Sequence, residues 1–200
     1  MQSPLAMLHD IRVSGTVVGL RPVGHEDAEF IVRLRAPSQR TQFIHRGATT
    51  VEAQRSWTDA YLARPDDYYF LIHHLADGRR EGTIGIYDVD AGRCAAEWGR
   101  WVLVPDSLAA IESVVLMYRV AFDVLHLSSV YSRTLARNVS VVAFHDSCGI
   151  PRDPTPRTIS VDGVGCEAIK HVLARTEWPD LAQRLQPMIQ RIGRSSRTSR

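Results

Sequence analysis

Hydrophobic positions along the chain repeat in two patterns, one typical of strands and one typical of helices. Runs rich in β-branched and aromatic residues, bounded by turn residues, predict strands. Apolar residues three and four positions apart predict amphipathic helices. The predicted strands are 16–21, 68–74, 82–89, 95–104 and 129–135, with two weaker ones at 157–161 and 166–174. The predicted helices are 25–35, 51–62, 107–125, 139–148 and 179–192.

The order of these elements predicts one α/β domain with a mixed sheet. A strand and two helices precede a meander of three strands; a long helix, a strand, a short helix and two strands follow. Helix 107–125 carries a wide apolar stripe, so we expect it to pack against the sheet. The domain is expected to span 15–192, after an N-terminal extension at 1–14 and before a flexible basic tail at 193–200.

Charge and hydropathy disfavour several classes of partner. The 200 residues carry 24 basic and 22 acidic side chains, for a formal net charge of +2. So small an excess predicts no broad surface for nucleic acid or for an anionic membrane. No apolar run approaches the ~18 residues of a spanning helix, and the N-terminus lacks a signal-peptide core. We therefore expect a cytoplasmic protein.

The cysteines predict neither a disulfide framework nor a metal site. Cys94, Cys148 and Cys166 cannot all pair within the chain. Their spacing with one another and with the histidines is not that of a zinc site. We expect free thiols in a reducing compartment and no metal.

The junction between strand 95–104 and helix 107–125 is a candidate binding site. The first-turn N–H groups of a helix have no partner within the helix and can hold a phosphate or a pyrophosphate. Ser107 stands at this junction. It could equally serve only as a cap of the helix.

Motifs around this junction resemble those of a known family. Residues 98–105 are Trp-Gly-Arg-Trp-Val-Leu-Val-Pro, and Glu112, Ala121-Phe, Asn138 and the segment Phe-His-Asp-Ser-Cys-Gly at 144–149 follow. Over about 15–178 the chain resembles the GNAT superfamily of acyl-CoA-dependent N-acetyltransferases. It is most similar to the RimJ/RimL-like branch, which acetylates ribosomal proteins, and to the PseH-like amino-sugar acetyltransferases. The segment 43–61, with Thr-Thr-Val-Glu-Ala-Gln-Arg-Ser-Trp at 49–57, also resembles the amino-sugar group.

The resemblance implies the GNAT fold and acetyl-CoA as cosubstrate. In that fold a mixed, mostly antiparallel sheet flanked by helices splits into a V between two central parallel strands, and acetyl-CoA lies in the opening. The residues that the resemblance assigns to acetyl-CoA are Leu103, Val104, Ser107, Leu108, Ala109, Ala110 and Asn138. The first two would hold the acetyl and pantetheine portions, the N–H groups of the next four would face the pyrophosphate, and the asparagine would contact the pantetheine arm.

The phosphate-binding segment departs from the family pattern. Relatives carry a basic, glycine-rich loop of the form Arg/Gln-x-x-Gly-x-Gly/Ala. Here residues 106–111 are Asp-Ser-Leu-Ala-Ala-Ile, with no glycine and one carboxylate. The carboxylate of Asp106 would have to point away from a bound phosphate. This departure leaves open a relative that binds acetyl-CoA weakly or has lost catalysis.

Glu97 is the candidate general base. It lies in the strand expected to carry the acetyl site, and partial burial raises the pKa of a carboxyl group toward neutrality. Glu97 could instead pair with Arg100 or Arg119, or bind the substrate ammonium. Glu112, on the long helix, is expected to make a structural hydrogen bond rather than take part in the chemistry.

His145 is the candidate acid for the departing thiolate. It falls four positions before Gly149, where many GNAT relatives carry a tyrosine with that role. An unperturbed imidazole titrates near ~6.5, which suits proton transfer at neutral pH. Alternatively, His145 is a helical histidine held only by a hydrogen bond.

The acceptor pocket is expected between the first two helices and their connection. Five side chains could supply flat walls for a sugar or a nucleotide, although aromatics at such spacings also build cores. They are Phe43, His45, Trp57, Tyr87 and Trp98. Four arginines could bind phosphates of the substrate or of CoA, although exposed arginines are often only solvated. They are Arg40, Arg46, Arg133 and Arg137.

These observations predict an acetyl-CoA-dependent N-acetyltransferase acting on a primary amine by direct attack in a ternary complex. The amine is expected to belong to an amino sugar, either free or linked to a nucleotide. The alternatives are acetylation of a protein N-terminus or an antibiotic amine, and a non-catalytic binding protein with the same fold. Leu181, Leu185 and Ile189 in the last helix could close the core or join two copies in a homodimer.

Overall fold

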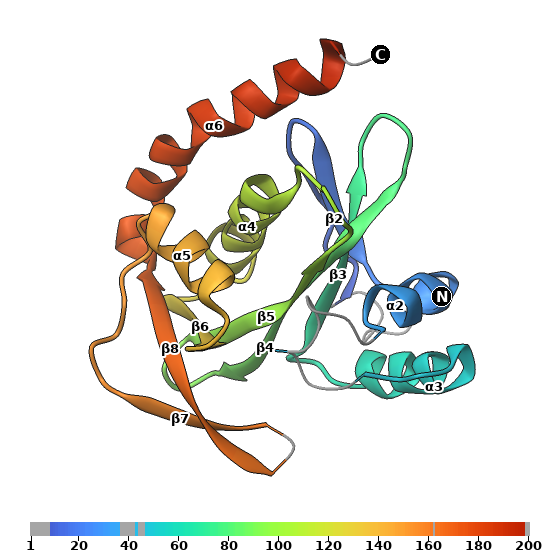
Figure 1. The fold of residues 1–200 in the computed structure, drawn as a ribbon, viewed down its shortest axis with the longest axis horizontal. Coiled ribbons are helices and arrows are strands. Elements are labelled where there is room, and N and C mark those ends of the chain that lie inside the picture. The colour runs from blue at the N-terminus through green and yellow to red at the C-terminus, as the bar shows by residue number, and fades with distance from the viewer. Residues whose placement is uncertain (1–8, 37–42, 44–46, 162, 199–200) are drawn as a thin grey trace.

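Eight strands form one mixed sheet in the order β1-β2-β3-β4-β5-β6-β8-β7 (Figure 1). The structure is a computed structural model that describes residues 9–36, 43, 47–161 and 163–198. The strands are β1 (Val13–Ser14), β2 (Val18–Pro22), β3 (Tyr68–His74), β4 (Arg80–Asp90), β5 (Ala95–Leu103), β6 (Ser129–Leu135), β7 (Arg157–Val161) and β8 (Val164–Ala174). Neighbouring strands are antiparallel except β5 and β6, which are parallel. The predicted α/β class and mixed sheet are confirmed.

Helices cover both faces of this sheet. On one face lie η1 (His25–Asp27), α2 (Ala28–Leu34) and α3 (Val51–Leu62). On the other lie α4 (Ala110–Arg119), its π-helical continuation η2 (Val120–Val124), α5 (Val139–Ser147) and α6 (Trp178–Thr198), which follows the single turn η3 (Arg175–Glu177). Figure 1 shows α4 and α5 beside the divergence of β5 and β6.

Three predicted boundaries are wrong. Val13 and Ser14, placed in an N-terminal extension, pair with β2 as the edge strand β1. The helix predicted from 107 begins at Ala110, because Asp106 adopts a left-handed φ of 58° and Ser107 forms a turn with its side chain. The last helix, predicted to end at 192, continues to Thr198 through residues assigned to the tail.

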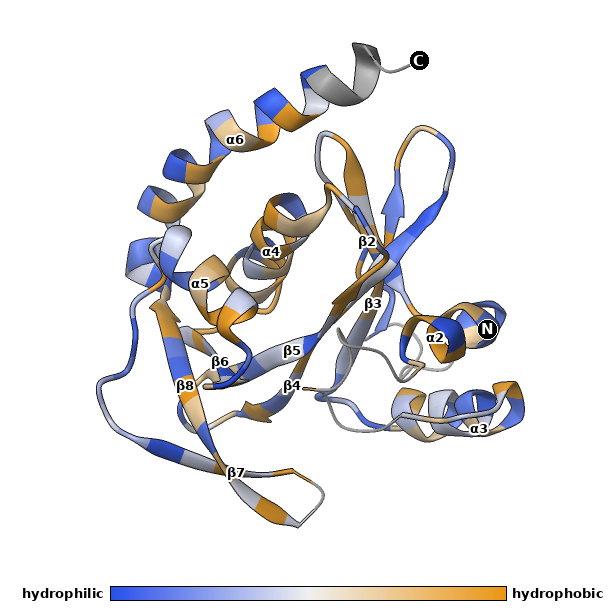
Figure 2. Cartoon of the chain, in the orientation of Figure 1, coloured by the Kyte–Doolittle hydropathy of each residue, from blue (hydrophilic) through white to orange (hydrophobic). Residues whose placement is uncertain are grey.

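The main core lies between the sheet and α4, as the wide apolar stripe predicts. Met117, Tyr118 and Phe122 are at most 1% exposed. The helix α6 alternates polar and apolar positions (Figure 2), and its Leu181, Leu185 and Ile189 are 1–3% exposed within the single chain. These three side chains therefore close the core of their own chain.

Glu112 joins α4 to the turn between β1 and β2. Its Oε2 accepts hydrogen bonds from the N–H groups of Val17 (2.9 Å) and Val18 (3.0 Å). Its Oε1 accepts one from Thr16 N–H. The Glu112 side chain is buried, so these backbone N–H groups replace the hydrogen bonds that its carboxylate would make with water. The expectation of a structural hydrogen bond is confirmed.

The pairing of β5 with β6 stops after three residue pairs. Ala95 pairs with Ser129, Ala96 with Val130 and Glu97 with Tyr131. Beyond that point β5 remains paired with β4, and β6 with β8 along its whole length. The two central strands therefore diverge, which is the V-shaped split implied by the family resemblance.

Replacing Glu112 with Gln should destabilise the fold. A glutamine retains one acceptor oxygen but places an NH₂ group against backbone donors that the carboxylate satisfies. We expect a loss of about 2 kcal/mol in the free energy of unfolding, since hydrogen bonds to charged groups contribute ~1.5–3 kcal/mol. Urea unfolding measures this change. The control Glu29→Gln, which removes an exposed pair with Arg33, should change stability little; equal effects would contradict the assignment.

Candidate active site

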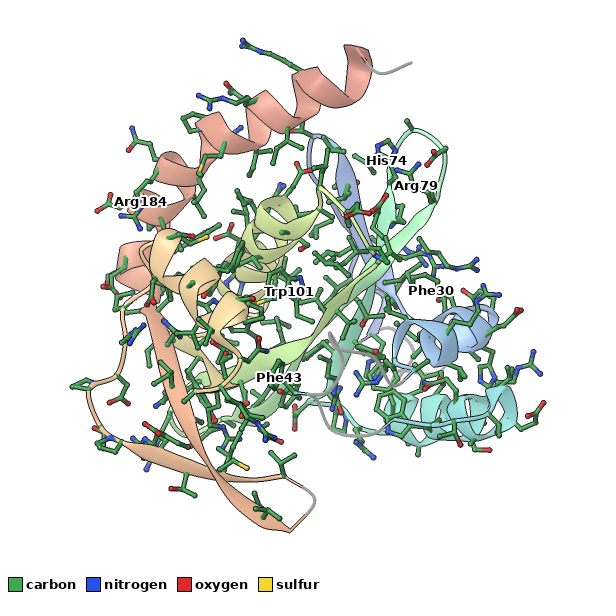
Figure 3. The ribbon with its side chains drawn as sticks, viewed as in Figure 1. Phe30, Phe43, His74, Arg79, Trp101 and Arg184 are labelled. Carbon is green, nitrogen blue, oxygen red and sulfur yellow. The ribbon has the colours of Figure 1, made fainter. Side chains whose placement is uncertain are left out.

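A cavity of about 750 Å³ opens where β5 and β6 diverge. Strands, helices and loop residues from both sides of the split contribute to its wall. The lining includes residues 97–101 of β5, 132–135 of β6, Asn138, Val141 and His145 at α5, Gln54 and Trp57 of α3, 158–161 of β7, and Phe43. Figure 3 labels Phe43 and Trp101, which lie on this cavity. The cavity therefore joins the split to the surface near α3.

Glu97 lies at the apex of the split, in the last residue pair between β5 and β6. Its carboxylate is buried and accepts hydrogen bonds from Nε (2.8 Å) and Nη2 of Arg133 on β6. The hydroxyl of Tyr87 lies 3.4 Å from Oε1. The alternative that Glu97 pairs with an arginine is confirmed, but the arginine is Arg133 and not Arg100 or Arg119, because parallel pairing places Arg133 across the split from Glu97.

Two opposing influences act on the Glu97 carboxyl group. Burial raises its pKa above the ordinary value, whereas the ion pair with Arg133 lowers it; burial is the larger effect. A raised pKa suits a proton acceptor working near neutrality. The guanidinium, however, occupies one of the two carboxylate oxygens in this state.

Arg100 holds a bulge in β5 on the face of the sheet covered by α3. Thr83 pairs with Val102 but Gly85 pairs with Gly99, so β5 contains one extra residue, and Arg100 has φ 51°. The bulge reverses the usual alternation of side chains. Arg100 therefore lies on the same face as Glu97.

The Arg100 guanidinium is enclosed on this face. Both its Nη atoms donate to Asp67, with an Nη2–Oδ2 distance of 3.0 Å. Its Cζ lies 4.5 Å from the ring centroid of Tyr87, 5.4 Å from that of Trp57 and 5.6 Å from that of Tyr69. Trp101 anchors the opposite face by donating from Nε1 to Ser113 Oγ of α4 (3.2 Å). The bulge is thus fixed on both faces.

The backbone of β5 beyond the bulge has one edge toward the split. The N–H of Val104 donates to the carbonyl of Glu81 in β4 (2.9 Å) and is not available to a ligand. Successive residues of a strand direct these groups to opposite edges. Leu103 and Val104 are the two positions expected to hold the acetyl and pantetheine portions. The backbone groups of Leu103 therefore face the split, whereas the N–H of Val104 faces β4.

The loop before α4 is organised by Ser107 and a buried carboxylate. Ser107 Oγ donates to Glu81 Oε2 (2.6 Å) and accepts from Ala109 N–H (3.2 Å), which closes a turn before the helix. The N-cap of α4 is Ala109, which has no side-chain cap, so the alternative that Ser107 caps the helix is wrong. Ser107 N–H lies 3.4 Å from the carbonyl of Val104. Two of the four N–H groups expected to face a pyrophosphate thus have partners within the loop. Leu108 and Ala110 provide the other two N–H groups.

This loop fits CoA less well than the split does. Asp106 is exposed and so can point away from a ligand, but Glu81 places a second carboxylate beneath Ser107. Arg79 pairs with Glu81 at 2.8 Å and offsets its charge. The residues of 103–110 do not line the cavity described above, whereas Asn138 does. The split offers an open strand edge to a thioester, and a pyrophosphate would have to rely on backbone N–H groups.

His145 lies on the cavity but is uncharged at neutral pH. Its ring packs against Trp98, with centroids 5.2 Å apart, and against His171, 4.7 Å apart. Burial and the neighbouring His171 lower the pKa of His145 to about 3. Its Nδ1 is buried without a hydrogen-bond partner among the described residues. The expectation that this imidazole titrates near neutral pH is therefore wrong.

The described aromatic residues expected in the acceptor pocket all line the cavity: Phe43, Trp57, Tyr87 and Trp98. Trp98 also contacts the Tyr118 ring at 5.8 Å, so it belongs to the core as well. Arg137 lies over Phe43, with Cζ 5.8 Å from the ring centroid. The candidates His45, Arg40 and Arg46 lie outside the described residues.

Sequence reasoning missed several cavity residues. They are Arg35, Gln54, Arg64, Tyr69 and Ser132. The Nε2 of Gln54 and the Oγ of Ser132 are buried without a hydrogen-bond partner among the described residues. A glutamine within a helix does not indicate a binding site in the sequence. Ser132 can be recognised as a site residue only when the position of the split is known. Both atoms point to a polar ligand, because native proteins rarely leave buried polar groups unpaired.

The chain matches the acetyltransferase (GNAT) domain over residues 18–150. The chain belongs to the GNAT acetyltransferase family. No curated protein matches it in sequence. Among solved structures, apo FdhC, described as a nucleotide-linked sugar GNAT, is 26% identical, with a TM-score of 0.70 over 86% of this chain and 94% of FdhC.

Two further structures share the fold of this GNAT acetyltransferase. A GCN5-related N-acetyltransferase from Brucella melitensis is 20% identical, with a TM-score of 0.77 over 90% of this chain and 85% of its own. A mutant of the spermidine N-acetyltransferase SpeG from Vibrio cholerae is 13% identical, with a TM-score of 0.69 over 82% and 97%. GNAT acetyltransferases use acetyl-CoA as acetyl donor.

The described residues include neither a helix that could span a membrane nor a cluster of potential metal ligands. None of their helices combines the length and hydropathy needed to cross a membrane. No group of three His, Cys, Asp or Glu side chains among them is placed to hold a metal ion.

Replacing Arg100 with Met should destabilise the protein through Asp67. Among the described residues, the substitution leaves the buried Asp67 carboxylate with only Arg64 as a charged partner, at 3.3 Å. We expect a loss of about 3 kcal/mol in the free energy of unfolding, because removing one partner of a buried ion pair strands the other. The double variant Arg100→Met/Asp67→Asn should recover part of that loss. If urea unfolding shows that the losses of stability from Arg100→Met and Asp67→Asn simply add in the double variant, the proposed pairing is contradicted. The control is Arg93→Gln, because the Arg93 side chain is 85% exposed.

His145 should make the fold less stable in acid. Because the pKa of His145 is lowered to about 3 in the folded state, unfolding takes up a proton below ~6.5. Stability is therefore full above that pH and declines as the pH falls toward 4. In His145→Phe this decline in stability should be shallower. Part of the decline should remain because burial also lowers the pKa of His171. Unfolding measured between pH 4 and 7 tests this, with the exposed His126→Asn as control; equal slopes would contradict it.

Proposed function

We propose that this GNAT acetyltransferase transfers the acetyl group of acetyl-CoA to the primary amine of an amino sugar linked to a nucleotide. The observation that carries the proposal is the composition of the cavity wall toward α3. Four arginines line it, whereas the acidic residues that line it are Asp88 and Glu97. Aromatic rings of Trp57, Tyr69 and Tyr87 lie beside them.

Such a wall suits a phosphate-bearing sugar better than a polyamine or a cationic antibiotic. Arginine binds phosphate oxygens bidentately, and aromatic faces bind sugar rings and bases. The four arginines are Arg35, Arg64, Arg100 and Arg133. The 26% identity with a protein described as a nucleotide-linked sugar GNAT supports the same substrate class. The free thiols of Cys94, Cys148 and Cys166 agree with a cytoplasmic enzyme.

The donor would lie along the split. Backbone groups of Leu103, Ser132 Oγ and Asn138 would hold the acetyl and pantetheine portions, and the N–H groups at the start of α4 would face the pyrophosphate. The cavity would bring the thioester and the amine together, which supplies much of the rate enhancement in a direct transfer. The backbone edge of β5 that faces the split would polarise the thioester carbonyl.

The proton balance needs one acceptor and one donor. Glu97 would take the first proton from the substrate ammonium, and the freed amine would attack the thioester carbon. As the carbon–sulfur bond breaks, the second proton on nitrogen passes to sulfur, and Glu97 releases its proton to solvent. Because His145 is neutral, it would donate a hydrogen bond to the departing sulfur rather than act as an imidazolium acid.

Acetylation of a panel of amines tests the proposal. The panel contains nucleotide-linked amino sugars, free amino sugars, a peptide with a free N-terminus, an aminoglycoside and spermidine. We expect the first class to be acetylated with the highest kcat/KM. Glu97→Gln should lower kcat by at least 100-fold, since general-base catalysis contributes ~10²–10⁴, while the exposed Glu52→Gln should match wild type.

Binding separates the enzyme from a non-catalytic relative. Acetyl-CoA should raise the midpoint of thermal unfolding, because a ligand that binds only the native state stabilises it. No shift at millimolar acetyl-CoA would support a non-catalytic protein with the GNAT fold. Preferred acetylation of the peptide or the aminoglycoside would contradict the amino-sugar assignment.

A further inference from the structure

The ion pair between Glu97 and Arg133 joins two unlike environments. The Glu97 side chain is 7% exposed, whereas that of Arg133 is 38% exposed. The carboxylate is held on a buried part of β5, and the guanidinium reaches it from β6 across the split. Of the two partners, Arg133 therefore has the freedom to leave.

This pair conflicts with the role proposed for Glu97. The two hydrogen bonds from the Arg133 guanidinium offset part of the increase in proton affinity that burial gives the Glu97 carboxylate. An ammonium brought next to it would also lie close to the positive charge of Arg133. Turnover therefore requires that Arg133 release the carboxylate before the amine arrives.

The other arginines of the cavity are held differently. Arg100 is fixed by both its Nη atoms on Asp67 and by three aromatic rings. Arg64 also contacts Asp67. Among the described residues, Arg133 pairs with one carboxylate, that of Glu97, and its Cζ lies 5.9 Å from the Tyr131 ring centroid. Arg133 is thus the cavity arginine whose release would also free a candidate base.

We propose that Arg133 is a specificity-determining residue, which neutralises Glu97 in the free enzyme and moves to a phosphate of the acceptor in the complex. This inference rests on the proposed function, because it assigns to an anionic group on the amino sugar the task of freeing the base. Glu97 offers the Arg133 guanidinium one oxygen, Oε2, whereas a phosphate offers it two oxygens and more negative charge. A cationic or neutral amine offers no such exchange.

The mechanism selects substrates in the chemical step as well as in binding. An acceptor without phosphate leaves Arg133 on Glu97, so the base stays engaged. An acceptor with phosphate removes the arginine and leaves a buried carboxylate beside the ammonium. The phosphate could belong to a nucleoside diphosphate or to a sugar 1-phosphate, and both present the same oxygens to a guanidinium.

Arg133→Gln tests the proposal by a reversal of preference. The best amino sugar of the panel is supplied in three forms: linked to a nucleoside diphosphate, as its 1-phosphate, and free. For the phosphorylated forms we expect kcat/KM to fall at least tenfold in the variant. For the free sugar we expect it to rise severalfold, because Glu97 is no longer engaged. Arg93→Gln, an exposed arginine that pairs with Asp90, should leave both values unchanged.

The pH dependence supplies a second readout. Removing Arg133 removes an influence that lowers the pKa of Glu97. The acidic limb of kcat/KM for the free sugar should therefore move to higher pH in Arg133→Gln. In wild type saturated with acetyl-CoA, the phosphorylated sugar should show the same upward displacement relative to the free sugar in kcat profiles.

Binding of phosphate probes does not depend on turnover. Titration calorimetry with UDP and with inorganic phosphate should show affinity for wild type that falls at least tenfold in Arg133→Gln. Arg133→Lys keeps the charge but loses the bidentate geometry, so its loss should be intermediate. Thermal unfolding of each variant checks that it is folded. If Arg133→Gln loses more affinity for UDP than for inorganic phosphate, the anion belongs to a nucleotide. If the two losses of affinity are equal, it belongs to a sugar phosphate.

Several outcomes would overturn the proposal. Equal losses for phosphorylated and free sugars in Arg133→Gln would show a merely structural residue. Equal UDP and phosphate affinities in wild type and variant would show that Arg133 does not bind the anion. If wild type acetylates no amino sugar, the proposed function fails, and the binding titrations still decide whether Arg133 holds a phosphate.

Discussion

The divergence of β5 and β6 after Glu97 and Tyr131 is the constraint on which the rest of the structure depends. β6 cannot follow β5, because its other edge is paired with β8 along its full length. β5 cannot follow β6, because its bulge is fixed by Arg100 to Asp67 and by Trp101 to α4. The open edges leave backbone polar groups that a ligand or water can pair with, so the hydrogen-bonding geometry makes the split a candidate binding site.

The elements could be predicted from the sequence because each has a strong local signal. The strands contain runs of β-branched residues. The helices have apolar faces that are buried in the core, as Met117 and Tyr118 of α4 are. Boundaries failed where a side chain or a backbone angle decided them. Asp106, with a left-handed φ, delays the start of α4, and no periodicity contains that information.

The contacts of the candidate site were less predictable than its residues. Glu97 was identified from its strand, but its partner Arg133 is set by the register of a parallel pair 36 positions apart. Arg100 lies on the Glu97 face only because a bulge reverses the alternation. His145 lies on the cavity, yet its protonation depends on the burial provided by neighbours such as Trp98 and His171.

The small net charge of the chain now has a local explanation in the cavity. Arg100 and Arg64 face Asp67, and Arg133 faces Glu97, so basic side chains in the wall are balanced within the chain. The anionic acceptor that we propose would therefore meet no unpaired positive surface, and it would compete with a carboxylate for a guanidinium. Competition of this kind costs affinity but yields discrimination, because a ligand without the anion gains nothing from the arginine. A balanced cavity thus favours selection of the acceptor over tight binding of any polyanion.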